Sequence, residues 1–421
     1  MEMFSTFLCV SGVCIAGGVL RKFSEKPIDP DKQKLNDFFE TTNFCNKKEN
    51  PEFAKVSWIK DYNNFKLFGV NIPIGCDINV LLRMKYALEN LFKNDVEILY
   101  NNQDYRIKVY KSKLKKAEDY PFEIIKAPDI KHLYITPGVS LDGPMTLNLS
   151  ETVPNILVAA TSGAGKSTLV KGILCQLIEN YTSKELNLIY MDNKGGLESN
   201  FFKNVEHLTY RTKNPHQTID TLLNLKAEMF RRMDLLEDQE VSNIINYNRK
   251  VKDGEKLPFI LAVIDELFSF MTLPKSSRNE DEIYTQNVAY STMGEIASMC
   301  RAVGIHLMFC TQKPTSDVIP TFITCNCGLR IGLKTSTEQE SRNIIEDSGL
   351  ELIDKEAKGS GIIKSGELTK FQSFYLTDQM VVNICKKHYN ATKKEIKTAV
   401  LTEEIETKTN NIDWRNIMRG M

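Results

Sequence analysis

The residues best suited to carry out chemistry lie in a glycine-containing loop that ends in a lysine and two hydroxyl side chains. The loop reads Ala-Thr-Ser-Gly-Ala-Gly-Lys-Ser-Thr over residues 160–168. Its glycines allow the backbone to turn tightly, so that N–H groups can face phosphate oxygens. Lys166 would reach the β- and γ-phosphates of ATP, and Ser167 would ligate Mg²⁺. The expected nucleotide-binding residues are Ala160, Thr161, Ser162, Gly163, Ala164, Gly165, Lys166, Ser167 and Thr168.

The flanks of this loop favour a phosphate site over a chance glycine-rich turn. An apolar run over residues 156–159 precedes it, and apolar residues at helical spacing follow over 169–178. A strand, a loop and a helix in this order suit a phosphate site, because the start of the helix adds a positive dipole end. One departure is Ala160, which replaces the first glycine of the pattern G-x-x-x-x-G-K-[ST]. We expect a right-handed or extended backbone at that alanine.

Two adjacent carboxylates, Asp265 and Glu266, form the second chemical feature. They follow six apolar residues, 259–264, a pattern typical of a buried parallel strand. Parallel sheets bind ligands at the carboxyl ends of their strands. We therefore expect Asp265 to hold Mg²⁺ together with Ser167, and Glu266 to polarise the attacking water. Two acids at a strand end also occur as ordinary loop starts, but a phosphate loop upstream disfavours that reading.

A third apolar run, residues 305–310, is followed by Gln312, which could contact the γ-phosphate or the water. Further strands are predicted over 186–191 and 328–333, and a long amphipathic helix over 218–237. Strands that alternate with helices after a phosphate loop predict an α/β fold with right-handed crossovers.

Composition narrows the class of protein only a little. Lys+Arg and Asp+Glu are equal at 54 each, so net charge gives no indication of a nucleic-acid partner, although a basic patch can be local. The ten cysteines show no repeated spacing, and Cys325 and Cys327 are too close together for the common zinc pairs. The five histidines are isolated and predict no metal site. A reducing cytoplasm is the simplest environment for the main body.

The amino-terminal segment has the composition of a membrane anchor. Residues 3–20 carry no charge, and a helix of that length spans about 27 Å, close to the hydrocarbon thickness of a bilayer. Arg21, Lys22 and Lys26 follow at once, which favours a cytoplasmic main body. A cleaved signal peptide would carry its positive charge before the apolar run, where Glu2 lies instead. A signal peptide and a buried or irregular segment remain the alternatives.

The chain after this segment divides into a linker and a small domain. Residues 23–51 are polar and contain several prolines, which indicates a linker. Residues 52–134 combine a helical pattern over 78–92 with two strand patterns, 96–100 and 105–110, around a polar turn. This predicts a small α+β domain, in which no residues point to chemistry.

An ordered set of stretches resembles the FtsK/SpoIIIE family of P-loop motor ATPases. It extends over about residues 135–380 and comprises residues 139–143, 160–167, 192–195, 228–233, 243–248, 257–266, 301–307, 311–314 and 341–345. Each stretch alone is a weak signal, but their order and spacing together are specific. Lys313, like Ala160, departs from the residue usual in the family, and neither change removes the catalytic lysine or acids.

The resemblance implies a RecA-like P-loop NTPase domain, with a mostly parallel sheet flanked by helices. Such domains assemble as hexameric rings that move double-stranded DNA with little sequence specificity. Lys166 and Ser167 carry over as nucleotide and Mg²⁺ ligands, Asp265 as the Walker B acid and Glu266 as the hydrolytic base. Gln312 carries over as the sensor. An arginine should also reach the neighbouring subunit's nucleotide. Arg301, Arg330 and Arg342 are the candidates, and we count Arg301 among the catalytic residues.

The layout is most similar to the coupling proteins of conjugative elements. We therefore expect a transmembrane anchor at 1–22, a linker at 23–51, the α+β domain at 52–134, the ATPase domain at 135–380 and a C-terminal helix and charged tail at 381–421. The expected protein is a single-pass membrane protein with a cytoplasmic ATPase domain, and its expected partners are DNA and a transfer channel or relaxase complex. Two alternatives are an ATPase that drives protein secretion and a membrane scaffold that binds nucleotide without hydrolysing it.

Overall fold

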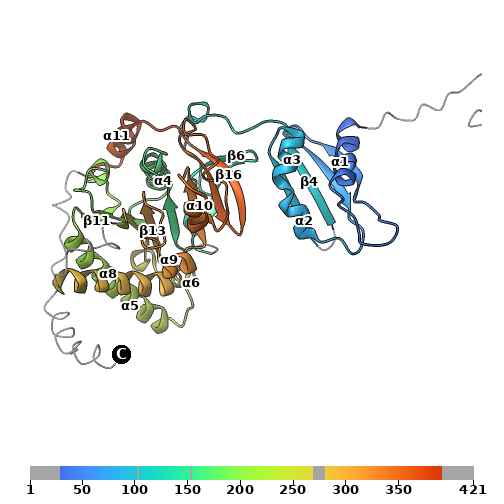
Figure 1. Cartoon of the computed structure of the whole chain (residues 1–421). Helices are drawn as coiled ribbons and strands as arrows, with labels where there is room; N and C mark the ends of the chain where they lie inside the picture. Colours follow the sequence, from blue (N-terminus) through green and yellow to red (C-terminus); the bar gives the residue numbers. More distant parts are fainter. Residues whose placement is uncertain (1–28, 102–103, 152–153, 269–279, 391–421) are drawn as a thin grey trace, which may run out of the picture. The chain divides into compact units, whose positions relative to one another are not determined.

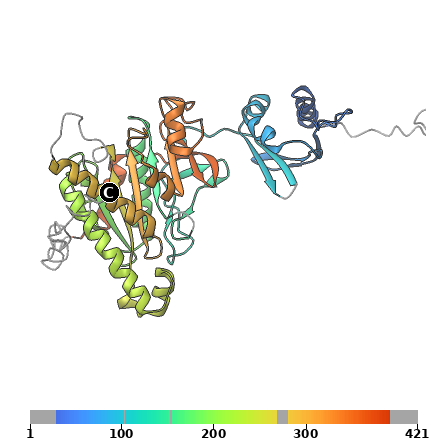
Figure 2. The same cartoon turned by 60° about the horizontal axis from the view of Figure 1, so that its bottom comes forward.

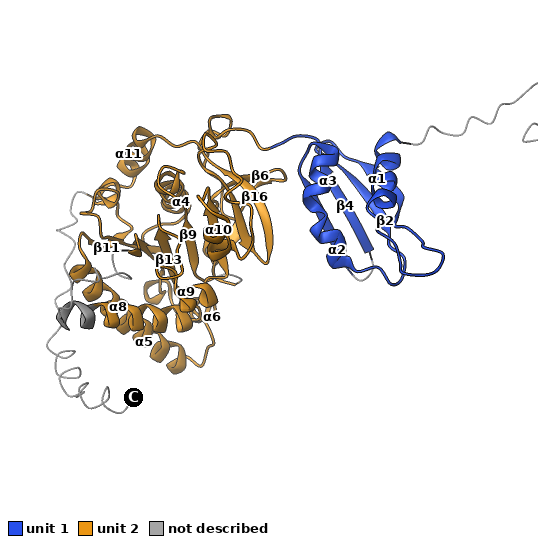
Figure 3. Ribbon diagram, in the orientation of Figure 1, with its two compact units in different colours: residues 1–113 blue, residues 114–421 orange. Residues whose placement is uncertain are grey.

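The computed structural model describes residues 29–101, 104–151, 154–268 and 280–390 (Figure 1). The chain divides into two compact units, residues 1–113 and 114–421 (Figure 3). The division lies before the boundary at 134/135 that the sequence led us to expect. Residues 114–134 belong to the second unit, where the amides of Ile125 and Ala127 donate hydrogen bonds to Gln176 and Asn180, each at 3.0 Å.

The first unit is a four-stranded antiparallel sheet with helices packed against it. The strand order is β1-β2-β4-β3, and β3 and β4 pair from Val96 opposite Val109 to Asn101 opposite Asp104, as the two predicted strands require. The predicted helix over 78–92 is present as two consecutive helices that meet at Met84. The elements of this unit are α1 (Pro30–Thr41), β1 (Lys55–Asp61), β2 (Phe65–Asn71), α2 (Ile78–Arg83), α3 (Lys85–Phe92), β3 (Val96–Asn101) and β4 (Asp104–Tyr110).

The prediction of a linker over 23–51 is wrong for the part that the structure describes. Residues 30–41 form helix α1, which begins after Asp29, whose carboxylate accepts a hydrogen bond from the amide of Asp31 at 2.8 Å. Leu35 and Phe39 of α1 are fully buried in the core of the first unit. Leu35 and Phe39 are the fully buried positions of the helix, and the polar residues around them gave the segment the composition of a linker.

The second unit is built on a ten-stranded mixed sheet. Its strand order is β11-β10-β12-β13-β9-β14-β15-β16-β6-β7; the strands from β11 to β14 are parallel, and those beyond β14 are antiparallel. A separate two-stranded sheet pairs β5 with β8. The strands of the two sheets are β5 (Tyr134–Ile135), β6 (Gly138–Ser140), β7 (Gly143–Pro144), β8 (Leu147–Asn148), β9 (Ile156–Ala159), β10 (Leu186–Asp192), β11 (Leu208–Thr212), β12 (Phe259–Asp265), β13 (Ile305–Thr311), β14 (Leu329–Leu333), β15 (Ser360–Ser365) and β16 (Glu367–Ser373).

Helices cover both faces of this sheet, as the α/β prediction requires. One buried cluster joins α4 and α11 to one face, and a second joins α5, α8, α9 and α10 to the other. Figure 2 shows α5 and α8 side by side on that second face. The helices of this unit are η1 (Ala117–Asp119), α4 (Lys166–Asn180), η2 (Ser199–Phe202), α5 (Pro215–Asp238), α6 (Ile244–Lys250), η3 (Asp253–Glu255), α8 (Glu280–Met299), α9 (Thr321–Asn326), α10 (Glu338–Ile345) and α11 (Asp378–Lys387).

The register of the parallel strands brings the predicted site residues to one edge of the sheet. Asp265 of β12 lies opposite both Asp192 of β10 and Cys310 of β13, and Cys310 in turn lies opposite Val158 of β9. The loops that follow these strands therefore leave the sheet at the same level. Strand β13 separates β9 from β12 and leaves a strand's width between the phosphate loop and the two acids.

The predicted membrane anchor over 1–22 lies outside the described residues, as does the tail after residue 390. Within the described ranges, no helix has both the length and the apolar character needed to cross a bilayer. Helix α11 contains the start of the predicted C-terminal segment.

The packing of α1 leads to a test of its place in the first unit. Phe39→Ala should lower the free energy of unfolding of this unit by about 3–5 kcal/mol, because it removes a fully buried aromatic ring. Urea denaturation of the full chain can be followed through the fluorescence of Trp58 in β1, in a background with Trp414→Phe. Glu40→Ala, an exposed position on the same helix, is the control. Equal stability of the two variants would mean that α1 is not part of the core.

Candidate nucleotide-binding site

The predicted phosphate loop connects β9 to α4. Gly163 and Gly165 have φ values of +83° and +105°, which a residue with a side chain rarely adopts. Gly165 has a second reason to be glycine, because an added Cβ would lie 3.0 Å from the amide nitrogen of Gly359. That amide donates a 2.9 Å hydrogen bond to the carbonyl of Ala164. The loop is therefore held from the side by the turn that leads into β15.

The start of α4 provides the features of an anion site. Helix α4 begins at Lys166, and the first turn of any helix has N–H groups without partners inside the helix. These groups and the positive end of the dipole attract phosphate. Ala160 does not have a positive φ, as we expected, and its amide donates to the carbonyl of Thr311 at 3.2 Å. The alanine in place of glycine thus fits the loop.

Lys166 and Asp265 form a buried ion pair. Their Nζ and Oδ1 atoms lie 2.5 Å apart, and their side chains are only 4% and 7% exposed. Burial alone would lower the pKa of Lys166, but the acidic groups around it, including Asp265 and Glu266, raise the pKa above its usual value. The lysine is therefore charged. Ser167, one residue further along α4, adds a hydroxyl oxygen, and oxygen ligands of these two kinds suit Mg²⁺.

Glu266 is held in a constrained position beside this pair. Its backbone has a φ of +74°, which is unusual for a residue with a side chain and marks a locally strained position. The hydroxyl of Thr311 and the amide of Gln312 donate to its Oε1 at 3.2 and 3.3 Å. Nζ of Lys194 lies 2.7 Å from its Oε2. The carboxylate is thus fixed from the end of β13 and from the turn after β10.

The charge state of Glu266 follows from these contacts. Burial alone would raise its pKa, whereas the hydrogen bond and charge of Lys194, the amide of Gln312 and the charge of Lys166 together lower the pKa below its usual value. An ionised carboxylate beside a phosphate site is what a general base requires.

Lys194 is a site residue to which the sequence gave no role. It lies in the turn after β10, where Asp192 accepts hydrogen bonds from the amides of Lys194, Glu198 and Ser199, each at 3.1 Å. In the sequence, this turn was recognised only as one of the stretches that resemble the family. The contact between Lys194 and Glu266 follows from the pairing of β10 with β12, which a single sequence does not reveal.

The structure places the predicted sensor and the three candidate arginines in different parts of the second unit. Gln312 lies at the same edge as the phosphate loop, and its backbone N–H donates to Glu266. Arg301 precedes β13 at the opposite edge of the sheet, is exposed, and donates to the carbonyl of Glu151. Arg330 is buried and bonded to Glu346 at 2.8 Å, so its side chain is occupied within the subunit. Arg342 is exposed on α10 and paired with Glu338. The role of an arginine towards a neighbouring subunit stays a prediction.

Comparison with known proteins gives a family match for part of the chain. Residues 131–316 match the model of the FtsK/SpoIIIE family. The chain is 35% identical over 233 residues to a DNA translocase FtsK of Campylobacter jejuni, and 32% identical over 274 residues to one of Staphylococcus aureus. These matches cover 55% and 62% of this chain but only 23% and 33% of those relatives.

Two solved structures share the fold at lower sequence identity. A conjugation coupling protein, TcpA of pCW3, in its monomer form with ATPγS, has a TM-score of 0.59 at 21% identity, over 85% of this chain and 99% of that one. The cytoplasmic domain of the type VII secretion ATPase EccC of Thermomonospora curvata has a TM-score of 0.55 at 18% identity, over 69% of this chain and 36% of that one.

The ion pair of Glu266 leads to a prediction on stability and pH. Lys194→Met should lower the free energy of unfolding of the second unit by about 1–3 kcal/mol at pH 7, since the buried carboxylate loses its cation. A carboxyl group whose pKa is lowered by folding stabilises the protein above its unfolded pKa, and this stabilisation is lost as the pH falls through the folded pKa. The difference from the unmodified chain should therefore be complete at neutral pH and shrink below about pH 4.5.

Calorimetric unfolding of the full chain across this pH range measures the difference. Lys203→Met, which removes an exposed lysine from the same region of the sequence, is the control. A stability loss of equal size at pH 7 and pH 4 would contradict the assignment of Glu266 as the group that Lys194 stabilises.

Proposed function

We propose that this chain is an ATP-driven DNA translocase, because residues 131–316 match the model of the FtsK/SpoIIIE family. The observation that carries the proposal is the position of an ionised Glu266 at the same sheet edge as the phosphate loop and the buried pair of Lys166 and Asp265. A nucleotide site that also holds a positioned base is suited to hydrolysis as well as binding.

The residues of the site have separable roles in this proposal. Lys166 exchanges its contact with Asp265 for the β- and γ-phosphates and stabilises charge in the transition state. Ser167 and Asp265 would hold Mg²⁺, which neutralises phosphate charge when bound. Glu266 orients and polarises the attacking water, and Gln312, whose amide contacts Glu266, reports the state of the γ-phosphate to β13.

Assembly into a hexameric ring would supply the arginine that this site needs. Arg301 and Arg342 are exposed, so either can reach a neighbouring subunit, whereas Arg330 is engaged inside its own. In such a ring DNA would be held mainly through its phosphates, with little sequence specificity and strong dependence on salt.

The cellular setting that we propose is DNA transfer at a membrane. The uncharged segment over 3–20, with basic residues after it, would anchor the chain in the cell membrane with a cytoplasmic ATPase domain. The fold shared with a conjugation coupling protein over 85% of the chain supports a role in conjugative transfer, with a transfer channel or relaxase complex as partner.

Two other functions compete with this one. The fold is also shared with a type VII secretion ATPase, so protein could replace DNA as the substrate. A scaffold that binds nucleotide without hydrolysis is disfavoured by the presence of Lys166, Asp265 and Glu266 together.

The proposal predicts that DNA stimulates the hydrolysis of ATP. The full chain in detergent should hydrolyse ATP faster when long duplex DNA is present, because translocation couples the two processes. The stimulation should fade as salt rises from about 50 to 200 mM, since salt weakens phosphate contacts. Hydrolysis of equal rate with and without DNA would favour protein translocation, and absence of hydrolysis would favour the scaffold.

Two substitutions should separate the binding of nucleotide from its hydrolysis. Lys166→Ala should lose nucleotide binding, measured with a fluorescent ATP analogue, because the principal phosphate cation is removed. Glu266→Gln should retain binding and reduce turnover by at least about 100-fold, since the base is lost. Lys184→Ala and Glu237→Gln, at exposed positions, are the matched controls. Unchanged turnover in Glu266→Gln would show that another residue is the base.

A further inference from the structure

Two segments distant in sequence are joined at the end of the second unit. Residues 204–206 lie before β11, and residues 388–390 follow α11. The amide of Glu206 donates to the carbonyl of His388 at 2.9 Å, and the amide of Asn390 donates to the carbonyl of Asn204 at 3.1 Å. A β-bridge joins Val205 and Tyr389. The backbones are therefore held in a fixed antiparallel arrangement.

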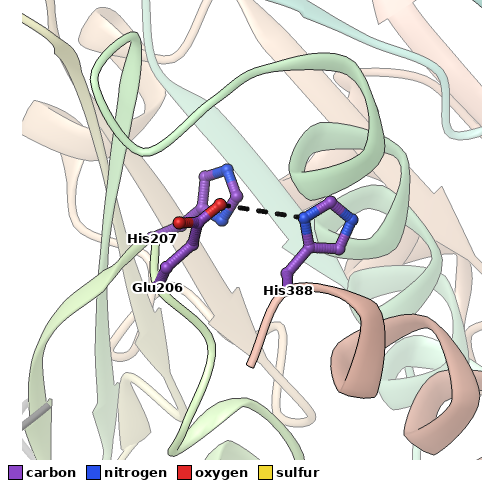
Figure 4. Close-up of side chains that lie close together, drawn as sticks. All are labelled: Glu206, His207 and His388. Atoms are coloured by element: carbon purple, nitrogen blue, oxygen red, sulfur yellow. Dashed lines mark ion pairs between the residues drawn. The ribbon is translucent and has the colours of Figure 1, made fainter. Parts of the chain in front are cut away.

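This arrangement brings three possible metal ligands together. One ligand atom each from Glu206, His207 and His388 lies within 4.8 Å of the others (Figure 4). Oε1 of Glu206 is 3.9 Å from Nδ1 of His388, and the two imidazole rings have centroids 5.6 Å apart. Two imidazoles and a carboxylate are a ligand set that suits zinc and neighbouring divalent transition metals.

The hydrogen bond of His207 prepares that ring for a metal. His207 is fully buried, and its Nε2 lies 2.7 Å from the carbonyl oxygen of Tyr181. A carbonyl can only accept, so Nε2 carries the hydrogen and Nδ1 carries the lone pair. A bond from the second ring nitrogen to a carbonyl is the usual support of a metal-binding histidine, because it fixes the tautomer and the ring orientation.

The ring of His388 lies near a second carboxylate. Its Nε2 lies 3.7 Å from Oε1 of Glu179, a carboxylate that is also held by Lys387 at 2.8 Å. The other ring nitrogen, Nδ1, faces Glu206. His207 is thus fixed by a hydrogen bond, whereas His388 lies between two carboxylates.

We propose that Glu206, His207 and His388 bind a Zn²⁺ ion that fastens the end of α11 to the segment before β11. Tetrahedral zinc places its ligand atoms about 3.3 Å apart, closer than the present limit of 4.8 Å. His207 is fixed, whereas Glu206 and His388 are only partly buried and can rotate inward. Water would complete the coordination.

The role of this ion would be structural. The cluster precedes β11 and therefore lies at the edge of the sheet opposite the phosphate loop. Helix α11 is also tied to α4, since Asp378 accepts from Lys171 at 2.9 Å. Zinc would hold the C-terminal end of α11 to the segment before β11, while the contact between Asp378 and Lys171 holds the start of α11 on α4. The proposal rests on these contacts alone and does not depend on the proposed DNA activity.

Cobalt absorbance tests the ligand set directly. The full chain, without a polyhistidine tag and without nucleotide, should bind one Co²⁺ with visible d–d bands of a nitrogen and oxygen site, and Zn²⁺ should displace it. His388→Gln and Glu206→Gln should each weaken Co²⁺ binding at least about tenfold. Both side chains are partly exposed, so folding should survive these changes. His216→Gln, at an exposed histidine outside the cluster, should bind as the unmodified chain does.

Thermal unfolding supplies an independent measurement. Saturating Zn²⁺ should raise the unfolding midpoint of the unmodified chain and of His216→Gln, because the ion binds only the folded state. The midpoint of His388→Gln should rise less at the same Zn²⁺ concentration. An intense near-ultraviolet thiolate band of cobalt would assign the metal to cysteines and overturn the proposal. Equal Co²⁺ affinity in His388→Gln and His216→Gln would also overturn it, and would leave an ordinary ion pair between His388 and Glu206.

Discussion

The buried pair of Lys166 and Asp265 is the interaction on which the site depends. A buried lysine is costly unless an opposite charge lies within reach. Lys166 follows the loop after β9 and Asp265 ends β12, and these two strands are separated by β13. Only the parallel register of β9, β13 and β12 brings the two charges to one level. The same register places Glu266 beside Gln312. The pairing of these strands therefore determines which side chains meet at the site.

Much of the second unit could be predicted, because its signals are local in sequence. Buried parallel strands are short apolar runs, and residues 259–264 and 305–310 were recognisable for that reason. The loop over 160–168 has a spacing that few other structures require. Helix α1 was missed because only Leu35 and Phe39 are fully buried in it, and most of the remaining residues of the segment are polar.

Contacts between distant segments could not be predicted in this way. Lys194 reaches Glu266 through strand pairing, and His207 meets His388 through a bridge at the far end of the unit. The histidines were isolated in the sequence, and folding brings two of them to one carboxylate. A single sequence carries no signal of contacts between residues that are distant in the chain. Periodic patterns within one helix or strand can be read from it directly.

The hydrogen bond between Gly359 and Ala164 has a mechanical consequence. It connects the phosphate loop to the turn before β15, and the amide of Ser373 in β16 donates to the carbonyl of the same glycine at 2.9 Å. The antiparallel strands are therefore coupled to the nucleotide end of the sheet by two backbone bonds in series. If a bound phosphate displaced the loop, these two bonds would displace the β15–β16 hairpin as well.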